Sequence, residues 1–506
     1  MSSNTQRIAR NTLMLYFRQI LIMLVSLYTV RVVLNTLGAE DYGIYNVVAG
    51  VVTMFGFLSG SMASASQRYF SFEIGRGDFE QLKKIFSLNL TIFMVIALSV
   101  LVLSETIGLW FVNNKMVIPP ERMDAARWVY QFSILSFLFT VLTTPYMAAI
   151  IAHEDMNIYA YVSIVEVILK LGIVFILRFI PTDKLQLYGF LLCIVTIINT
   201  AVYRTICTRK YQECKFGFYW NKDLFREITG YIGWSLFGSL TTVVRNQAVT
   251  ILLNQIFNPV VIAARSIASQ VNSAVSSFSN SFSTALQPQI IKSYSAGQKT
   301  EMIRLVSRGS KSTYFLMYLF VLPLVIEMPA VLSIWLKRAP DYAVIFTRLA
   351  LIDVLVNSIS FPLMTAARAT GKVKLYESVL GSIQIASFFI AWFVLILGAP
   401  AYSVMVVTIG ISVVMFIIRL VITRYLVGFS IRQFIFEAIF PAFMVTVVSA
   451  GLPILLYMVL KENIVRLCII LAVSVFSVCG CMYTLGLNKA ERKRMHEIIM
   501  NRIKRT

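Results

Sequence analysis

The chain has 506 residues, of which 58% are apolar and only 14% are charged, and its formal net charge is +21. A soluble protein of this length needs far more charged surface, so the composition excludes an ordinary soluble globular protein. It indicates an all-α polytopic membrane protein, because apolar segments of roughly 20 residues, each long enough to cross a bilayer, recur along the whole chain.

The N-terminal segment is not typical of a cleaved signal peptide. The stretch "MSSNTQRIARNT" is polar, and the apolar segment behind it carries Arg18 and Arg31 without a small-residue cleavage site. We therefore expect the first apolar segment to remain in place as a transmembrane helix.

Hydropathy, turn residues and charge together predict about fourteen transmembrane helices. Their expected limits are 13–35, 43–66, 86–112, 126–151, 158–180, 186–207, 228–254, 260–286, 312–336, 342–367, 375–398, 400–422, 434–460 and 464–486. A basic tail, "NKAERKRMHEIIMNRIKRT", follows and predicts either a surface helix or a disordered segment.

The lysines and arginines predict the orientation of these helices. The loops on the side of the N-terminus carry roughly three times as many of them as the opposite loops, which places both termini in the cytoplasm by the positive-inside rule. Membrane lipids are therefore expected partners, and the basic charge needs no nucleic acid to explain it.

The sequence also repeats itself once, at a spacing of about 220 residues. "TPYMAAIIAHEDMNIYAY" is similar to "FPLMTAARATGKVKLYES", which pairs Pro145 with Pro362, and an upstream match pairs Asn35 with Asn254. Six predicted helices separate the copies, and because six is even, the copies share one orientation. Two parallel lobes with a site between them are a known transporter architecture.

The repeat predicts three parts of the chain. Residues 1–209 form an N-lobe of six helices, residues 210–427 a C-lobe of six, and residues 428–506 the last two helices and the tail. In each lobe the proline stretch predicts a hinge where a helix reaches the cytoplasm, formed by Pro145 in one copy and by Pro362 with Gly371 in the other.

The stretch "LNTLGAEDYGIYNVVAGVVTMFGFLSGSMASASQRYFS" and the G-x-G-D turn at Gly75 to Asp78 resemble the second-helix region of Wzx-type O-antigen flippases. These flippases belong to a superfamily that includes the multidrug and toxic-compound extrusion (MATE) transporters and the lipid II flippases. The resemblance covers most of the first twelve predicted helices and implies a MATE-like fold.

That resemblance also implies a function. The expected substrate is a polyprenyl-diphosphate-linked oligosaccharide, moved by alternating access from the cytoplasmic to the outer leaflet of a bacterial inner membrane for polysaccharide or lipopolysaccharide export. Polysaccharide polymerase machinery is an expected partner. The protein is not expected to be an enzyme or to need a cofactor.

Charged residues inside predicted helices are costly and therefore indicate function. Arg18, Arg31, Arg245 and Arg265 lie in the leading helices of the two lobes, and a guanidinium group can bind two phosphate oxygens at once. We expect these four to be cavity cations that bind the diphosphate. Arg18 and Arg31 lie about 140° apart on an ideal helix, so they are not expected to reach one phosphate together, and both could instead extend to the interfaces.

Four further charges are candidates for ion coupling or for lining the cavity. Glu166 and Lys170 are spaced to form a salt bridge on one helix face, which is the alternative to a role in the cavity. Arg348 and Asp353 are poorly phased for each other, so Asp353 is expected to meet a cation from another helix or to couple an ion.

Other function classes remain as alternatives. A multidrug cation antiporter would need carboxylates rather than arginines in its cavity. A membrane glycosyltransferase or polymerase would need metal-binding acids, for which Glu40 and Asp41 in the first outer connection are the candidates. "ATGKVK" lacks the glycine and hydroxyl of a phosphate loop. The six cysteines show no metal-site spacing and no disulfide framework, so no metal is expected.

Overall fold

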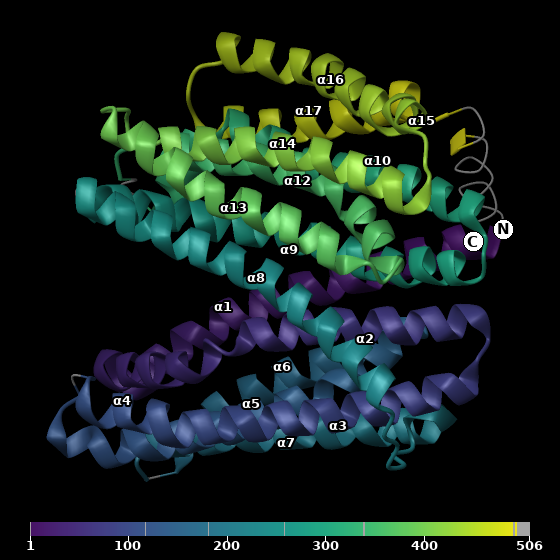
Figure 1. The fold of residues 1–506 in the computed structure, drawn as a ribbon. Coiled ribbons are helices and arrows are strands. Elements are labelled where there is room, and N and C mark those ends of the chain that lie inside the picture. The colour runs from purple at the N-terminus through teal and green to yellow at the C-terminus, as the bar shows by residue number, and fades with distance from the viewer. Residues whose placement is uncertain are drawn as a thin grey trace, which may run out of the picture. The chain divides into compact units, whose positions relative to one another are not determined.

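The computed structural model describes residues 2–116, 118–180, 182–257, 259–336, 340–488 and 491–492. Apart from Glu491 and Arg492, the basic tail lies outside the described residues. The described chain is helical and contains no strand, as Figure 1 shows. Twelve of its helices are long and apolar enough to cross a membrane, or thirteen if one bent pair counts as a span.

The predicted all-α membrane architecture is therefore confirmed, with a span count close to the fourteen expected. The predicted span 260–286 lies in α9 (Pro259–Ser295), which is 37 residues long. α9 is not among the twelve candidate spans because the serines and asparagines along it lower its hydropathy. The predicted span 43–66 is broken: the helices Glu40–Val52 and Gly56–Arg76 meet at a bend of 48°.

The structure divides into two compact units. Unit 1 comprises Met1–Leu240 and Ile291–Gly297, and unit 2 comprises Thr241–Ile290 and Gln298–Thr506. Both α8 (Lys222–Ile256) and α9 therefore contribute to both units. The lobe boundaries expected at 209 and 427 stay a prediction.

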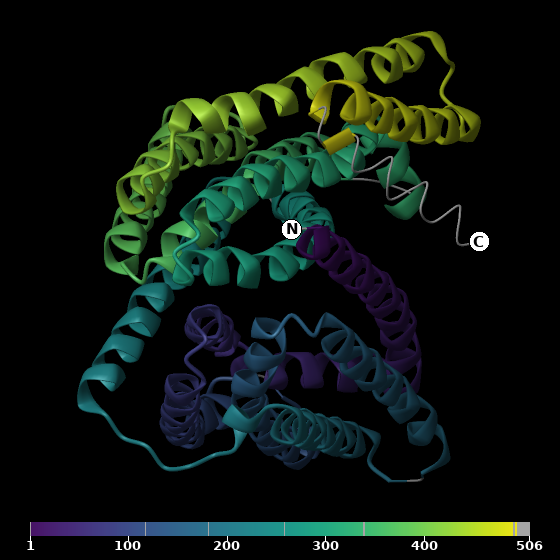
Figure 2. The ribbon, with the colours of Figure 1, turned by 90° about the vertical axis from the view of Figure 1, so that its right-hand side faces the viewer.

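Unit 1 is built around α5. Its helices are α1 (Ser2–Thr53), α2 (Gly56–Arg76), α3 (Phe79–Leu103), α4 (Leu109–Asn114), α5 (Met123–Ala152), α6 (Met156–Phe179) and α7 (Lys184–Lys210), with the first part of α8. α5 packs against α1, α2, α3 and α7, and α6 packs against α1 and α7. Figure 2 shows the linker that leaves α7 and reaches α8 without a long helix of its own.

The first outer connection is shorter than the loop that we expected. The label α1 covers two helices: the first ends at Gly38, whose φ of 86° and ψ of 168° are not helical, and the second begins at Glu40. Asp41 then forms an ion pair with Arg122, whose Nη1 also lies 2.6 Å from Asp183 Oδ2. An arginine that bridges two acids ties α1 to the starts of α5 and α7, so Asp41 has a structural partner.

Unit 2 contains the later helices in a similar bundle. They are the rest of α8, most of α9, α10 (Lys299–Ile326), α11 (Met328–Leu336), α12 (Ala343–Ala369), α13 (Val373–Ile396), α14 (Ser403–Val427), α15 (Ile431–Phe434), α16 (Phe440–Val459) and α17 (Ile464–Cys481). α12 packs between α10 and α14, and the pair α16–α17 packs on α10. Arg466 of α17 and Glu327 at the end of α10 are both buried and form an ion pair of 2.9 Å, which links α17 to α10.

Two turns in the first copy of the repeat have φ values similar to those of the equivalent turns in the second copy. Gly77 and Gly297 both precede a helix with φ near 75° (75° and 74°). Glu154 has φ 63°, and Gly371, its equivalent in the repeat, has φ 78°. Glycine adopts this conformation without steric cost, whereas a glutamate does not. The repeat therefore extends from the sequence to the backbone.

Candidate functional site

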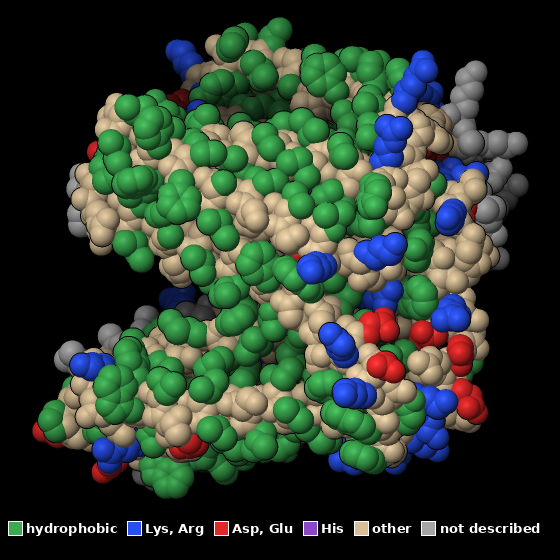
Figure 3. Space-filling model, viewed as in Figure 1, with side chains coloured by type: hydrophobic (Ala, Val, Ile, Leu, Met, Phe, Trp, Pro, Cys, Tyr) green, Lys and Arg blue, Asp and Glu red, His purple; other side chains and the backbone are tan. Residues whose placement is uncertain are grey.

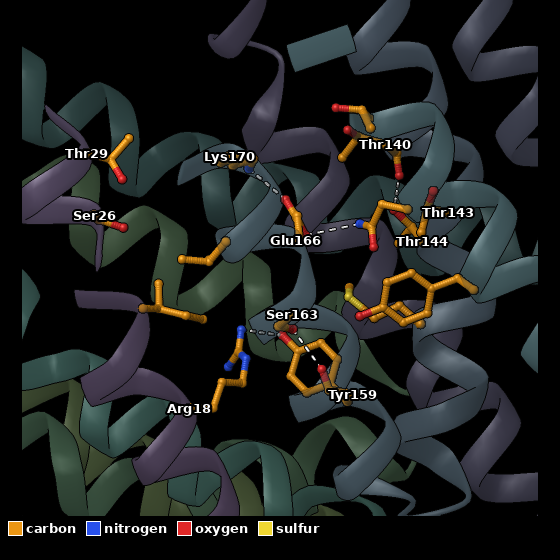
Figure 4. Close-up of a pocket in the computed structure, with 16 residues that line it drawn as sticks. Arg18, Ser26, Thr29, Thr140, Thr143, Thr144, Tyr159, Ser163, Glu166 and Lys170 are labelled. Atoms are coloured by element: carbon orange, nitrogen blue, oxygen red, sulfur yellow. Dashed lines mark hydrogen bonds and ion pairs between the residues drawn. The ribbon is translucent and has the colours of Figure 1, made fainter. Parts of the chain in front are cut away.

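Unit 1 contains a polar cavity of about 610 Å³ between α1, α5, α6 and α7. One face of α6 supplies Tyr159, Ser163, Glu166 and Lys170, which recur at helical spacing. α1 adds Arg18 (Figure 4). The remaining polar lining is uncharged and comes mostly from α5 and α7: Ser26, Thr29, Thr140, Thr143, Thr144, Thr196, Asn199 and Tyr203.

The charges in this cavity are arranged unevenly. Lys170 Nζ lies 2.6 Å from Glu166 Oε1, and Asn199 donates a hydrogen bond of 3.1 Å to the other oxygen of Glu166. This pair forms the salt bridge that its spacing predicts and also lines the cavity. Arg18 instead lies over the ring of Tyr159 and donates to its hydroxyl at 3.2 Å, while its buried Nε has no hydrogen-bond partner. Arg18 is thus a cation without a carboxylate partner among the described residues.

Unit 2 contains a second polar cavity of about 530 Å³. Arg245 of α8, Arg265 of α9 and Asp353 of α12 all line it. α9 also contributes uncharged polar side chains at helical spacing, namely Ser266, Ser269, Asn272 and Ser273. The serine-rich sequence of α9 therefore faces a cavity, at least in part.

The two arginines of this cavity have few protein partners. Arg245 donates to Asn246 Oδ1 at 3.4 Å, and Arg265 donates to the Asn246 carbonyl at 3.2 Å. Neither forms an ion pair within the part of the chain that the structure describes. A guanidinium group has five N–H donors, so most of their donor capacity remains for a ligand.

Asp353 lies between this cavity and a smaller one of about 270 Å³, which Arg245 also lines. One oxygen of Asp353 accepts from Ser412 at 2.5 Å and the other accepts from Asn357 at 3.0 Å. The structure thus places Asp353 beside an arginine of another helix, which is one of the two arrangements expected from the sequence. It offers no test of ion coupling.

The remaining predicted residues lie elsewhere. Arg31 is exposed on α1 and lines neither cavity. Arg348 donates to the carbonyls of Val325 and Ile326 at 2.8 and 3.1 Å, so it satisfies the last carbonyls of α10. A cavity role for Arg31 or Arg348 stays a prediction.

The prolines expected at the hinges are buried within continuous helices. Pro145 lies in α5 and Pro362 in α12, each about two turns before the helix ends. Gly371 forms the following turn with its positive φ. A hinge role for these positions stays a prediction.

Sequence reasoning missed a charged network around Glu154. Its carboxylate lies 2.8 Å from Lys292 and 3.2 Å from Arg7, and its carbonyl accepts from Asn11 at 3.2 Å. The signal was present, because Glu154 stands where the second copy of the repeat has Gly371. A glutamate held in a conformation that favours glycine indicates that its charge is needed there.

Comparison with protein families decides the classification. The model of the family described as "Polysaccharide biosynthesis protein" matches residues 8–294, more than half of the chain. The chain belongs to this family. Its predicted resemblance to Wzx-type flippases is thereby confirmed at the level of the family, while no curated protein matches the chain.

Solved structures similar to this member of the polysaccharide biosynthesis family are transporters. One is an outward-facing multidrug resistance MATE transporter of the MOP superfamily, with a TM-score of 0.73 and 11% identity over 84% of this chain and 96% of the other. Another is the Vibrio cholerae MATE transporter VcmN in its bent form, with a TM-score of 0.64 and 15% identity over 86% of this chain and 100% of the other. At these identities the likeness shows the fold, which is MATE-like as expected.

The family, the MATE-like fold and the candidate membrane spans together make this chain a multi-pass membrane protein. They do not identify the residues that bind a substrate.

Proposed function

We propose that the protein moves a polyprenyl-diphosphate-linked oligosaccharide across a bacterial inner membrane by alternating access, with both termini in the cytoplasm. The observation that carries this proposal is the pair Arg245 and Arg265 in a polar cavity, where neither forms a salt bridge with a carboxylate of the described residues. A diphosphate needs several cationic donors, and guanidinium groups supply them in a planar array.

The rest of the lining suits the other part of this substrate. Hydroxyl and amide side chains of α9 can exchange hydrogen bonds with sugar hydroxyls. In unit 1, Arg18 adds a cation whose Nε is unused, in a cavity that threonines also line. The polyprenyl tail would stay in lipid, because its transfer into a polar cavity would be unfavourable.

Transport of the lipid-linked glycan by purified protein in vesicles tests this assignment. We expect Arg245→Ala and Arg265→Ala each to reduce the rate about tenfold or more, since a hydrogen bond to a charged group contributes about 1.5–3 kcal/mol. Arg265→Lys should be intermediate, because an ammonium group cannot form the bidentate contact.

Arg424→Ala is the matched control, since Arg424 is exposed on α14 and lines neither cavity. Unchanged transport by both cavity alanine variants would refute the assignment, and so would an equal loss in the control.

Drug extrusion is the second candidate, because the solved relatives include MATE transporters and Asp353 lines the same cavity. A cationic drug would have to bind next to two arginines, which is electrostatically unfavourable. Glu166, the carboxylate of the unit 1 cavity, is neutralised by Lys170. Efflux of a cationic dye that depends on Asp353 but not on Arg265 would favour this alternative.

A further inference from the structure

A third cavity has no part in the proposed transport. It has a volume of about 790 Å³ and lies entirely within unit 1. Its walls are the start of α3, the end of α7 and the linker that follows α7, including Phe79, Lys83, Lys84, Tyr211 and Phe218. A volume of this size is typical of a small-molecule or headgroup site.

The position of this cavity along the helices suggests its environment. α3 begins at Phe79 and α7 ends at Lys210, and both helices are long and apolar enough to cross a membrane. The cavity therefore lies where two spans leave the bilayer. Aromatic and basic side chains are enriched at the membrane–water interface, where the apolar core of the bilayer meets the charged lipid headgroups.

The linker presents aromatic rings at this level. Its sequence "KFGFYWNK" exposes Phe218 at 78%, Trp220 at 53% and Phe216 at 49% of their surface. The linker is nonetheless fixed to α3: the Gly217 amide donates to Ser87 Oγ at 3.4 Å, and Lys84 lies over the Tyr219 ring. Exposed rings on an anchored segment indicate a surface that is covered by something apolar.

The cations of the cavity are available for an anion. Lys83 and Lys84 are exposed on the first turns of α3, and neither has an acidic partner within the described ranges. The N-terminal end of the α3 dipole adds to the positive potential. Figure 3 shows lysine and arginine atoms next to hydrophobic and acidic ones at this end of unit 1, at the lower right.

One of the two carboxylates that line the cavity has a protein partner. Glu213 Oε1 lies 2.5 Å from His153 Nε2. Lys210, which also lines the cavity, lies 2.9 Å from Asp155, which does not line it. The ring of His153 stacks on Tyr211 with centroids 4.2 Å apart, which makes a rigid floor. Glu80, on the first turn of α3, is the other carboxylate of the lining.

We propose that this cavity binds the phosphate-bearing headgroup of a lipid in the adjacent leaflet. Lys83 and Lys84 bind the phosphate, while Phe79 and Phe218 contact the glycerol, sugar or first carbons of the lipid. An anionic phospholipid and a polyprenyl diphosphate share this chemistry, and the experiment separates them. The site is distinct from both candidate transport cavities.

Tryptophan quenching in nanodiscs tests the proposal on the full-length protein. Brominated phosphatidylglycerol should quench Trp220 more strongly than brominated phosphatidylcholine, with a Trp220→Phe variant defining the signal of this residue. The double variant Lys83→Gln/Lys84→Gln should reduce that preference at least about fivefold, since each basic residue near an anionic surface contributes strongly.

The control variant Lys299→Gln/Lys372→Gln removes two exposed lysines from unit 2 on the same predicted side of the membrane. It should keep the full preference. Equal quenching by both lipids, or an equal loss in the control, would overturn the proposal, because either result indicates general surface charge. Transport is not part of this readout, so its outcome is independent of the proposed function.

Competitors then identify the source of the phosphate. Relief of quenching by undecaprenyl diphosphate at low molar ratio supports binding of the substrate lipid before transport. Quenching that persists with that competitor supports a bulk anionic phospholipid. Relief by inorganic pyrophosphate alone would overturn the lipid assignment, because the site would then need no lipid.

Discussion

At the scale of single residues, the end of unit 1 around Asp155 and Glu213 should be sensitive to acid. Burial raises the pKa of Asp155, but hydrogen bonds from Tyr211 and Lys210 outweigh it and leave the pKa below its usual value. Burial likewise raises the pKa of Glu213, and its hydrogen bond with His153 outweighs that effect. Both carboxylates therefore favour the folded state when they are ionised.

The sign of the pH dependence follows from these lowered pKa values. The stabilisation is complete above the unfolded pKa values of about 4 and is lost as pH falls further and the folded carboxylates take up protons. We expect the melting temperature of the purified protein to drop below about pH 4. Asp155→Asn should lower the melting temperature at pH 7 and make its fall below about pH 4 less steep. An unchanged fall would contradict the role given to Asp155.

Residue-scale prediction from sequence succeeded where a charge had its partner on the same helix. Glu166 and Lys170 formed the salt bridge that their spacing indicated, because one helix fixes both positions. It did not find the partners of Arg348, which are carbonyls at the end of α10, although Arg348 itself lies in α12. When tertiary packing brings two residues together from different helices, their spacing in the sequence does not reveal the contact.

At the scale of elements, Gly75 sets how closely α2 approaches the end of α9. A Cβ atom at Gly75 would lie 2.7 Å from the Cα and carbonyl oxygen of Lys292. Backbone atoms cannot move aside as a side chain can. The contact lies within unit 1, which includes the last turns of α9.

We expect Gly75→Ala to destabilise the protein by about 1–3 kcal/mol, as overpacking of a close contact does. Thermal or denaturant unfolding in detergent measures this change. Gly60→Ala is the matched control on the same helix, because a Cβ there meets nothing within 4 Å, and it should not destabilise the protein. Equal stability of the two variants would show that α2 and α9 do not stay in contact.

The elements themselves were largely predictable, because apolar runs between turn residues mark helices that cross a membrane. The exceptions have physical reasons. The two helices within α1 are separated only at Gly38, since a single glycine with a positive φ can break a helix without a longer loop. α9 is too polar for a hydropathy criterion because it lines a cavity rather than lipid.

At the scale of the whole molecule, the proposed orientation can be tested by labelling. In a variant that lacks the six native cysteines, Lys115→Cys lies at the end of α4 and Lys299→Cys at the start of α10. A membrane-impermeant maleimide added to intact cells should label the first and not the second, because the positive-inside rule places them on opposite sides. The reverse pattern would invert the proposed topology and the direction of transport.

The two turns at Glu154 and Gly371 record how the halves of the chain diverged. After a duplication, each copy is free to change its side chains, yet both copies still bend the backbone in the same left-handed way at this point. One copy uses glycine, the residue that adopts this conformation most easily. The other keeps a glutamate that α1 and α9 contact: Arg7 and Lys292 pair with its carboxylate, and Asn11 donates to its backbone carbonyl. The backbone conformation of this turn is therefore better preserved between the copies than the residue type. Relatives of this protein will be easier to find by comparing backbone turns than by comparing amino-acid sequences.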